Sequence, residues 1–259
     1  MNGEKRFLIL SLHGRKPLIC LIAAFSLAAL LLITALKPDA PVMKTALETG
    51  AKGRGTGALI VLDAGHGGID GGAVSVGGIP EKEINLAVAM KVRSVLLLNG
   101  FDVIMTRESD ASIHDPETEN GTIHEKKVSD INNRIAIMRQ HPDAILISIH
   151  QNTFSDPAVG GAQVFYVKNE ESRRLAEILQ AKLSAGLDGN GPKSPKEAYD
   201  TIKLMNSIEN TGVLVECGFL SNPDDEKKLM TDGYREQIAR CILDALNEFL
   251  NETEREETE

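Results

Sequence analysis

The chain has no tryptophan, only three cysteines, and few aromatic residues, which make up 4% of its 259 residues. Three cysteines cannot all pair with one another, and Cys20, Cys217 and Cys241 lie in apolar stretches without a C-x-x-C spacing. This pattern excludes a disulfide framework and favours small buried thiols. With 42% hydrophobic residues and a mean hydropathy of −0.11, the chain is not a disordered protein, a collagen or a multi-span membrane protein.

Positive charge is scarce beyond the N-terminus. The chain carries 28 lysines and arginines against 37 aspartates and glutamates, a net charge of −9. Four of the first 17 residues are basic, whereas six of the last twelve are glutamate. Because phosphate binding needs clustered lysine and arginine, the acidic body excludes a nucleic-acid-binding protein.

One long apolar run stands near the N-terminus. Residues 18–36 carry no charge, and as a helix this run would span roughly 28 Å, close to the hydrocarbon core of a bilayer. The basic residues before it predict that 1–17 stay in the cytoplasm and that the rest crosses the membrane. We therefore predict an uncleaved transmembrane signal anchor over 18–36 and an extracytoplasmic body joined by a linker over 37–57. A cleaved signal peptide is the alternative, although the cleavage site before Pro41 is weak.

Short apolar runs alternate with segments of helical period between residues 58 and 250. This alternation predicts one α/β domain with a central, mostly parallel sheet flanked by helices. Strands are expected at 59–62, 103–105, 145–149, 163–167 and 213–215. Helices are expected around 84–95, 128–138, 175–183 and 238–249, and another at Asn222-Pro223, a capping asparagine followed by a first-turn proline. An acidic tail over 251–259 is expected to follow.

Two polar insertions, 108–127 and 186–201, interrupt this alternation. Loops of this length in a compact domain are commonly rims of a functional site or partner surfaces. We predict that they provide the surface for a regulatory protein partner.

Three reactive side chains lie at the ends of predicted strands. His66 follows the first strand in a glycine-rich turn, His150 ends the strand 145–149, and Glu216 ends the strand 213–215. In open α/β sheets ligands bind beyond the carboxyl ends of the strands, so these residues are expected at one rim. Taken singly, His66 is also compatible with a plain turn residue and His150 with a core histidine.

Glu216 is the sharpest of the three signals. A carboxylate between Val215 and Cys217 is costly to bury unless it is paired, protonated or bound to a cation. Two histidines converging with a carboxylate are the donor set of a hydrolytic zinc site, which keeps one position open for water.

Motifs of other hydrolases are missing from the sequence. Residues 124–128 begin like H-E-x-x-H, but Val128 replaces the second histidine, and there is no G-x-S-x-G elbow. A phosphate-binding G-x-G-x-x-G loop starting at Gly65 fails because the last position is Asp70. The other histidines of the body are expected to be solvated loop residues: His114, His124 and His141.

Four segments together carry a family resemblance. They are G-H-G-G at 65–68, P-E-K-E-I-N-L at 80–86, S-I-H-Q-N at 148–152 and V-E-C-G-F-L-S-N at 215–222. In this order they resemble the zinc-dependent N-acetylmuramoyl-L-alanine amidases of bacterial cell-wall metabolism, the amidase 3 family, over about residues 58–250. The segments 103–110 and 202–205 bring the resemblance closer to the amidases with which spore formers mature cortex peptidoglycan.

The resemblance implies that His66, Glu81 and His150 ligate Zn²⁺ and that Glu216 is the catalytic carboxylate. Glu81 enters through the resemblance alone. Without it, Glu81 reads as a first-turn glutamate in a favourable position in the helix dipole. Glu83 is the nearest rival for the same ligand role.

The sequence departs from the family pattern at two positions. Ala64 stands where proline is common, and Gln151 stands where a small residue is common. We expect Gln151 to alter the wall of the cleft. Asn152 and Arg134 are further candidates, either for orienting the substrate or for a structural role.

The resemblance further implies hydrolysis of the amide between N-acetylmuramic acid and the L-alanine of the stem peptide. The spore-cortex resemblance implies action around the forespore, as the first step toward muramic lactam. The expected partners are peptidoglycan as substrate, the membrane through the N-terminal helix, and a regulatory protein. Two alternatives stay open: a zinc peptidase that cuts within the stem peptide, and a catalytically silent anchored protein that binds the wall or a partner.

Overall fold

The computed structural model describes residues 57–187 and 191–256. The predicted basic N-terminus 1–17, the apolar run 18–36, almost all of the linker 37–57 and Cys20 lie outside the described residues. Within those residues, no helix is both long and apolar enough to cross a membrane.

Six strands form one sheet in the order β2-β1-β3-β6-β4-β5. Their bounds are Leu59–Ala64 (β1), Asp102–Met105 (β2), Ile145–Asn152 (β3), Gln163–Tyr166 (β4), Lys196–Glu197 (β5) and Gly212–Phe219 (β6). β2, β1, β3 and β6 run parallel, whereas β4 pairs antiparallel with β6 and parallel with β5. The prediction of a mostly parallel sheet is confirmed.

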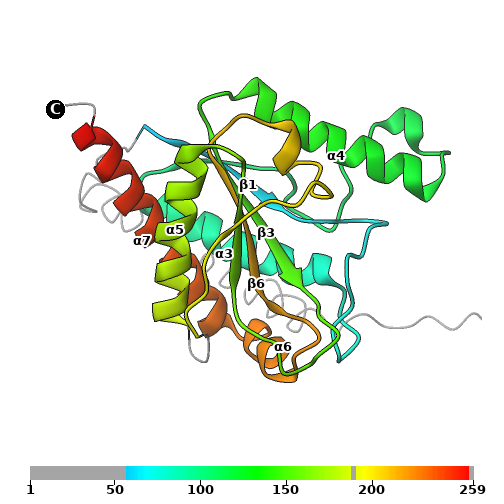
Figure 1. Ribbon diagram of the computed structural model, residues 1–259. Helices are drawn as coiled ribbons and strands as arrows, with labels where there is room; N and C mark the ends of the chain where they lie inside the picture. The colour runs from blue at the N-terminus through cyan, green and yellow to red at the C-terminus, as the bar shows by residue number, and fades with distance from the viewer. Residues whose placement is uncertain (1–56, 188–190, 257–259) are drawn as a thin grey trace, which may run out of the picture. The chain divides into compact units, whose positions relative to one another are not determined.

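Helices cover both faces of this sheet (Figure 1). One face packs against α3 (Glu81–Leu98), α5 (Glu170–Gly186) and α7 (Asp232–Glu256), and the other against α4 (Ile123–Gln140) and the short η3 (Met205–Ser207). Alternate residues of a strand point to opposite faces, so Ile60 and Leu62 of β1 join the first core and Val61 the second. The remaining helices are η2 (Pro116–Thr118) and α6 (Pro223–Leu229).

Helix caps explain where two of the helices begin. Asn222 caps α6 as predicted, because its side chain accepts hydrogen bonds from the backbone of Asp224 and Asp225. α4 begins at Ile123 rather than near residue 128, because Thr122 and Glu125 form a reciprocal capping box. The beginning of α4 therefore overlaps the end of the predicted insertion 108–127, and residues 108–122, which include η2, precede the helix.

Three further boundaries differ from the sequence prediction. β5 was not predicted, since two residues carry no periodicity; it forms where Ala198 N–H donates to the Tyr166 carbonyl. α7 continues to Glu256, so helix occupies the first part of the predicted acidic tail. β3 and β6 run to Asn152 and Phe219, so His150 and Glu216 lie within the strands, two and three residues before their last residues. Cys217 and Cys241 are free, buried thiols, as predicted.

Candidate metal centre and active site

The loop after β1 carries His66 at the carboxyl edge of the parallel strands. His66 has a φ of 61°, the left-handed region that non-glycine residues seldom adopt. The preceding residue is Gly65, and no larger residue fits at this position. A Cβ on Gly65 would lie 2.2 Å from Nε2 of His150. The missing side chain lets the imidazole of His150 pack directly on the β1 loop.

Glu81 reaches the same place from the first turn of α3. Its side chain is 3% exposed. One carboxylate oxygen accepts a hydrogen bond from Ala73 N–H at 2.9 Å, and the other accepts from Gln151 N–H at 3.1 Å. Two backbone N–H groups therefore hold the carboxylate, in addition to its contacts with the histidines.

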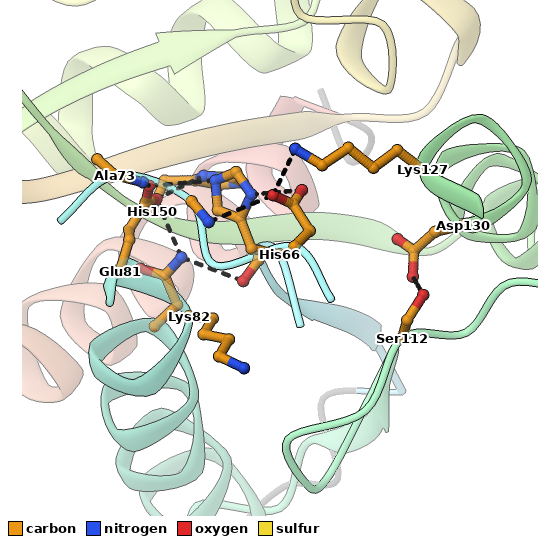
Figure 2. Close-up of polar contacts among 12 residues, drawn as sticks. His66, Ala73, Glu81, Lys82, Ser112, Lys127, Asp130 and His150 are labelled. Carbon is orange, nitrogen blue, oxygen red and sulfur yellow. Dashed lines mark hydrogen bonds and ion pairs between the residues drawn. The ribbon is translucent and has the colours of Figure 1, made fainter. Parts of the chain in front are cut away.

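The side chains of His66, Glu81 and His150 meet at one point (Figure 2). His66 Nε2 lies 3.1 Å from Glu81 Oε2, and His150 Nδ1 lies 3.0 Å from Glu81 Oε1. One ligand atom from each residue lies within 4.8 Å of the other two. Glu83 is exposed and does not belong to this cluster, so the geometry favours Glu81 over its rival.

Electrostatics at this cluster suit a cation. Burial would lower the pKa of His66, but its contacts with Asp70 and Glu81 raise the pKa to about 9. Burial would raise the pKa of Glu81, yet the two histidines hold it well below its ordinary value. A metal ion and a proton compete for the same lone pairs, so a site that attracts protons to histidine also attracts a divalent cation.

A second set of contacts orients the two imidazoles and the carboxylate. Asp70 Oδ2 accepts from His66 Nδ1 at 2.8 Å, which leaves Nε2 to face Glu81. Asn85 donates through Nδ2 to Glu81 Oε1 and to the Gly65 carbonyl, both at 3.1 Å. Asp70 and Asn85 were not predicted as site residues, because their only sequence signal is their position four residues after His66 and Glu81.

Gln151 does not shape the cleft, contrary to the expectation from the sequence. Its side chain is 4% exposed, lies away from the cavity, and donates to Asn85 Oδ1 at 3.2 Å. Because successive strand residues face opposite sides, Gln151 points into the α3 side of the sheet when His150 faces the rim. Gln151 thus supports Glu81 through Asn85.

Arg134 holds the β1 loop from the opposite side. Its guanidinium is buried, forms ion pairs with Asp63 and Asp130, and donates to the carbonyls of Ala64 and His66 at 3.0 and 2.8 Å. These contacts give Arg134 a structural role. Asn152 uses its side-chain oxygen to accept from Thr153 N–H and does not line the cavity.

Glu216 stands beside this cluster on β6. Among the described residues its Oε2 is buried without a hydrogen-bond partner. Burial is the main cause that raises the pKa of Glu216 to about 7. A carboxyl group with this pKa exchanges a proton readily near neutral pH, as a general base or acid must.

A cavity of about 280 Å³ joins these groups. His66, His150 and Glu216 line it together with Asp63, Asp70, Ser112, Lys127, Asp130, Arg134, Ser148, Thr201 and several aliphatic side chains. Ser112 and Thr201 come from the two polar insertions, which therefore form parts of the rim.

The other histidines differ from the sequence expectation. His114 is not solvated: its side chain is 13% exposed and contacts Ser112 and Glu119. His124 is exposed but lies in the first turn of α4, and His141 is the half-buried C-cap of that helix. None of the three belongs to the cluster formed by His66, Glu81 and His150.

The fold and the site together define an α/β protein with a mostly parallel sheet and a His–Glu–His cluster that could hold a metal ion, beside the half-buried carboxylate of Glu216. The chain belongs to the N-acetylmuramoyl-L-alanine amidase family, whose model matches residues 60–248. The germination-specific N-acetylmuramoyl-L-alanine amidase of Bacillus subtilis is 36% identical over 76% of this chain and 81% of its own length. The amidase AmiA of Escherichia coli is 28% identical over 78% of this chain and 79% of its own length.

Solved structures agree with this assignment. The CwlD amidase of Clostridioides difficile, solved in complex with the GerS lipoprotein, superposes with a TM-score of 0.71 at 37% identity. The superposition covers 75% of this chain and 98% of that chain. The protein is therefore an N-acetylmuramoyl-L-alanine amidase that acts on peptidoglycan.

Proposed function

We propose that this amidase is zinc-dependent, with His66, Glu81 and His150 as the metal ligands and Glu216 as the catalytic carboxylate. The observation that carries the proposal is the convergence of three metal donors in one cluster, two of which line the same cavity as Glu216, whose Oε2 is buried without a partner among the described residues. Two imidazole nitrogens and one carboxylate form a donor set used in catalytic zinc sites, and the Asp70 contact to His66 is the usual outer support.

Bound Zn²⁺ supplies a Lewis acid that polarises the scissile carbonyl and acidifies a water molecule. Glu216 accepts the proton of the attacking water and passes it to the departing amine of L-alanine. Its raised pKa suits both half-steps, because the carboxylate must gain and then lose a proton at neutral pH. Arg134 and Asp70 keep His66 in place while this proton moves.

The biological role that we propose is cortex maturation in spores. The similarity to a germination-specific amidase and to CwlD supports this role. Removal of the stem peptide from muramic acid would be the first step toward muramic lactam, with a separate deacetylase acting next. We further propose that residues 18–36 anchor the enzyme in the membrane with its body outside the cytoplasm around the forespore, and that a protein partner assists it, as the GerS lipoprotein accompanies CwlD.

A digestion of purified peptidoglycan tests the chemistry. The full chain should release peptides that begin with L-alanine and leave intact muramic acid, and mass spectrometry identifies both products. EDTA should abolish the release, and added zinc should restore it. Cleavage within the stem would instead indicate a peptidase, and no release under any condition would indicate a silent binding protein.

Two variants test the ligand assignment. His66→Ala and His150→Ala should each lose the bound metal, measured by elemental analysis of the purified protein. Full zinc occupancy in either variant would overturn the ligand assignment.

The cellular parts of the proposal have separate tests. Muramic lactam should be absent from the cortex of a strain lacking the gene. An alkaline phosphatase fused after Pro41 should be active, since that enzyme works only outside the cytoplasm. An unchanged cortex would refute the spore role and leave the amidase chemistry standing.

A further inference from the structure

The described residues that line the catalytic cavity include two permanently cationic side chains, Lys127 and Arg134. Arg134 is 3% exposed, and each of its three nitrogens already contacts a carboxylate or a backbone carbonyl. Four of its five N–H donors are engaged and the side chain is buried, so Arg134 is poorly placed to bind a ligand. Among the cationic side chains of this lining, Lys127 is therefore the better placed to contact an anionic part of a substrate.

Lys127 is placed to make such a contact. It projects from the second turn of α4, and its side chain is 47% exposed. Nζ lies 2.7 Å from Asp70 Oδ1, and the side chain lines the cavity. Figure 2 shows Lys127 extending from its helix toward His66. A lysine ammonium has three N–H donors, so this one ion pair leaves donors that face the open cavity.

The distance from the reacting atoms is short. Only the Asp70 carboxylate separates Lys127 from His66, with contacts of 2.7 Å on one side and 2.8 Å on the other. Consecutive residues of an extended peptide are about 3.8 Å apart, so the second residue after the scissile bond lies roughly 7 Å from the lactyl group. A group on that second residue can reach Lys127 while the scissile amide lies at the metal cluster.

Peptidoglycan carries a carboxylate at this place. The residue after L-alanine is D-glutamate, which is joined onward through its side chain and keeps a free α-carboxylate unless it is amidated. We propose that Lys127 binds this carboxylate and makes the enzyme prefer stem peptides with D-glutamate over those with D-isoglutamine. The inference rests on the proposed role of the His66–Glu81–His150 cluster as the reaction centre.

Two synthetic glycan oligomers test the proposal. Their stem peptides are identical except for D-glutamate in one and D-isoglutamine in the other, and the readout is the ratio of the two kcat/KM values for the zinc-loaded full chain. We expect the wild type to favour the D-glutamate substrate by about tenfold, the strength of one charge-assisted hydrogen bond. Lys127→Gln should bring the ratio to about one, and Lys127→Arg should restore most of it.

Matched variants separate recognition from general effects of charge. Lys126 pairs with Glu119 and Lys203 with Asn132, and neither lines the cavity, so Lys126→Gln and Lys203→Gln should keep the wild-type ratio. The proposal is wrong if the wild type shows no preference, or if Lys127→Gln lowers both kcat/KM values equally and also lowers zinc content, since Lys127 then only supports Asp70. Failure of the wild type to cleave either oligomer would overturn the proposed function and this inference with it.

Discussion

His150 and Glu216 stand opposite each other in the register of the parallel strands β3 and β6. Cross-strand neighbours project to the same side of a sheet, so the pairing places the imidazole of His150 and the carboxylate of Glu216 side by side. The two groups are thus fixed by backbone hydrogen bonds of the central strands rather than by a loop. A preorganised pair of this kind needs no rearrangement at the moment of reaction.

Glu216→Gln should separate metal binding from catalysis. Glutamine keeps the size of the side chain but cannot accept and return a proton, so we expect turnover to fall by about 10²–10⁴-fold with full zinc content. The release of peptides beginning with L-alanine measures turnover, and elemental analysis measures zinc. Glu83→Gln, on the exposed side of α3, is the control. Activity within tenfold of the wild type would mean that another group moves the proton.

Asn85→Leu should weaken metal binding from outside the ligand set. Leucine has the same branching and the same number of side-chain heavy atoms, but it cannot form the hydrogen bonds that Asn85 donates to Glu81 and to the Gly65 carbonyl. Losses of outer contacts typically cost 10–100-fold in metal affinity. A competition titration with a chelating dye measures this affinity, and Ser94→Ala on the exposed face of α3 should leave it unchanged. Equal zinc affinity in both variants would show that Glu81 needs no support from Asn85.

Gly65→Ala should displace His150 from the metal cluster. The added methyl group would lie 2.2–2.7 Å from three ring atoms of His150, too close for any relaxed contact. We expect loss of zinc and of activity with the sheet intact. Gly233→Ala is the matched control, because a Cβ at Gly233 meets nothing within 4 Å and alanine favours the helix it lies in. Retained zinc in Gly65→Ala would show that the imidazole can shift without losing the metal.

The parallel core was predictable because its strands are apolar and because the apolar residues of its helices repeat with the helical period. Strands β1, β3 and β6 are buried on both faces. Each therefore contains a run of consecutive aliphatic residues, which predicts a buried strand from the sequence alone. β5 escaped detection because two exposed residues, Lys196 and Glu197, carry no pattern of their own. The start of α4 was predictable in principle, since Thr122 and Glu125 form the T-x-x-E signature of a capping box.

The candidate site was only partly visible in the sequence. His66, His150 and Glu216 follow from strand ends, because parallel strands share one carboxyl edge. Glu81 does not, since its place depends on how the first turn of α3 packs against β3, and the family resemblance alone pointed to it. Asp70 and Asn85 lie four residues after His66 and Glu81, a spacing too common to single them out, and the contact of Lys127 with Asp70 joins segments that are remote in the chain. The prediction that Gln151 forms part of the cleft wall was wrong. Successive strand residues face opposite sides of the sheet, so Gln151 faces the core when His150 faces the rim.

Asp63 makes the free energy of unfolding depend on pH in the acidic range. It is 1% exposed and accepts hydrogen bonds from Thr106 and Ser148 at 2.8 and 2.6 Å, besides its ion pair with Arg134. Burial would raise the pKa of Asp63, but the charge of Arg134 and these hydrogen bonds lower it from 3.8 to about 2. A lowered folded-state pKa stabilises the fold above the unfolded value and loses this contribution as the pH falls through the folded value.

The wild type should therefore lose about 2 kcal/mol of unfolding free energy through Asp63 between about pH 4 and pH 2. Asp63→Asn should lack this acid-dependent loss, and at pH 7 it should be about 3 kcal/mol less stable because Arg134 loses a buried counter-charge. Urea denaturation in EDTA from pH 7 to pH 2.5 measures both variants, and the exposed Asp102→Asn serves as the control. Because His66 titrates in both proteins, its effect cancels in the difference. That difference should shrink as the pH falls, and a constant difference would mean that Asp63 is not ionised in the folded protein.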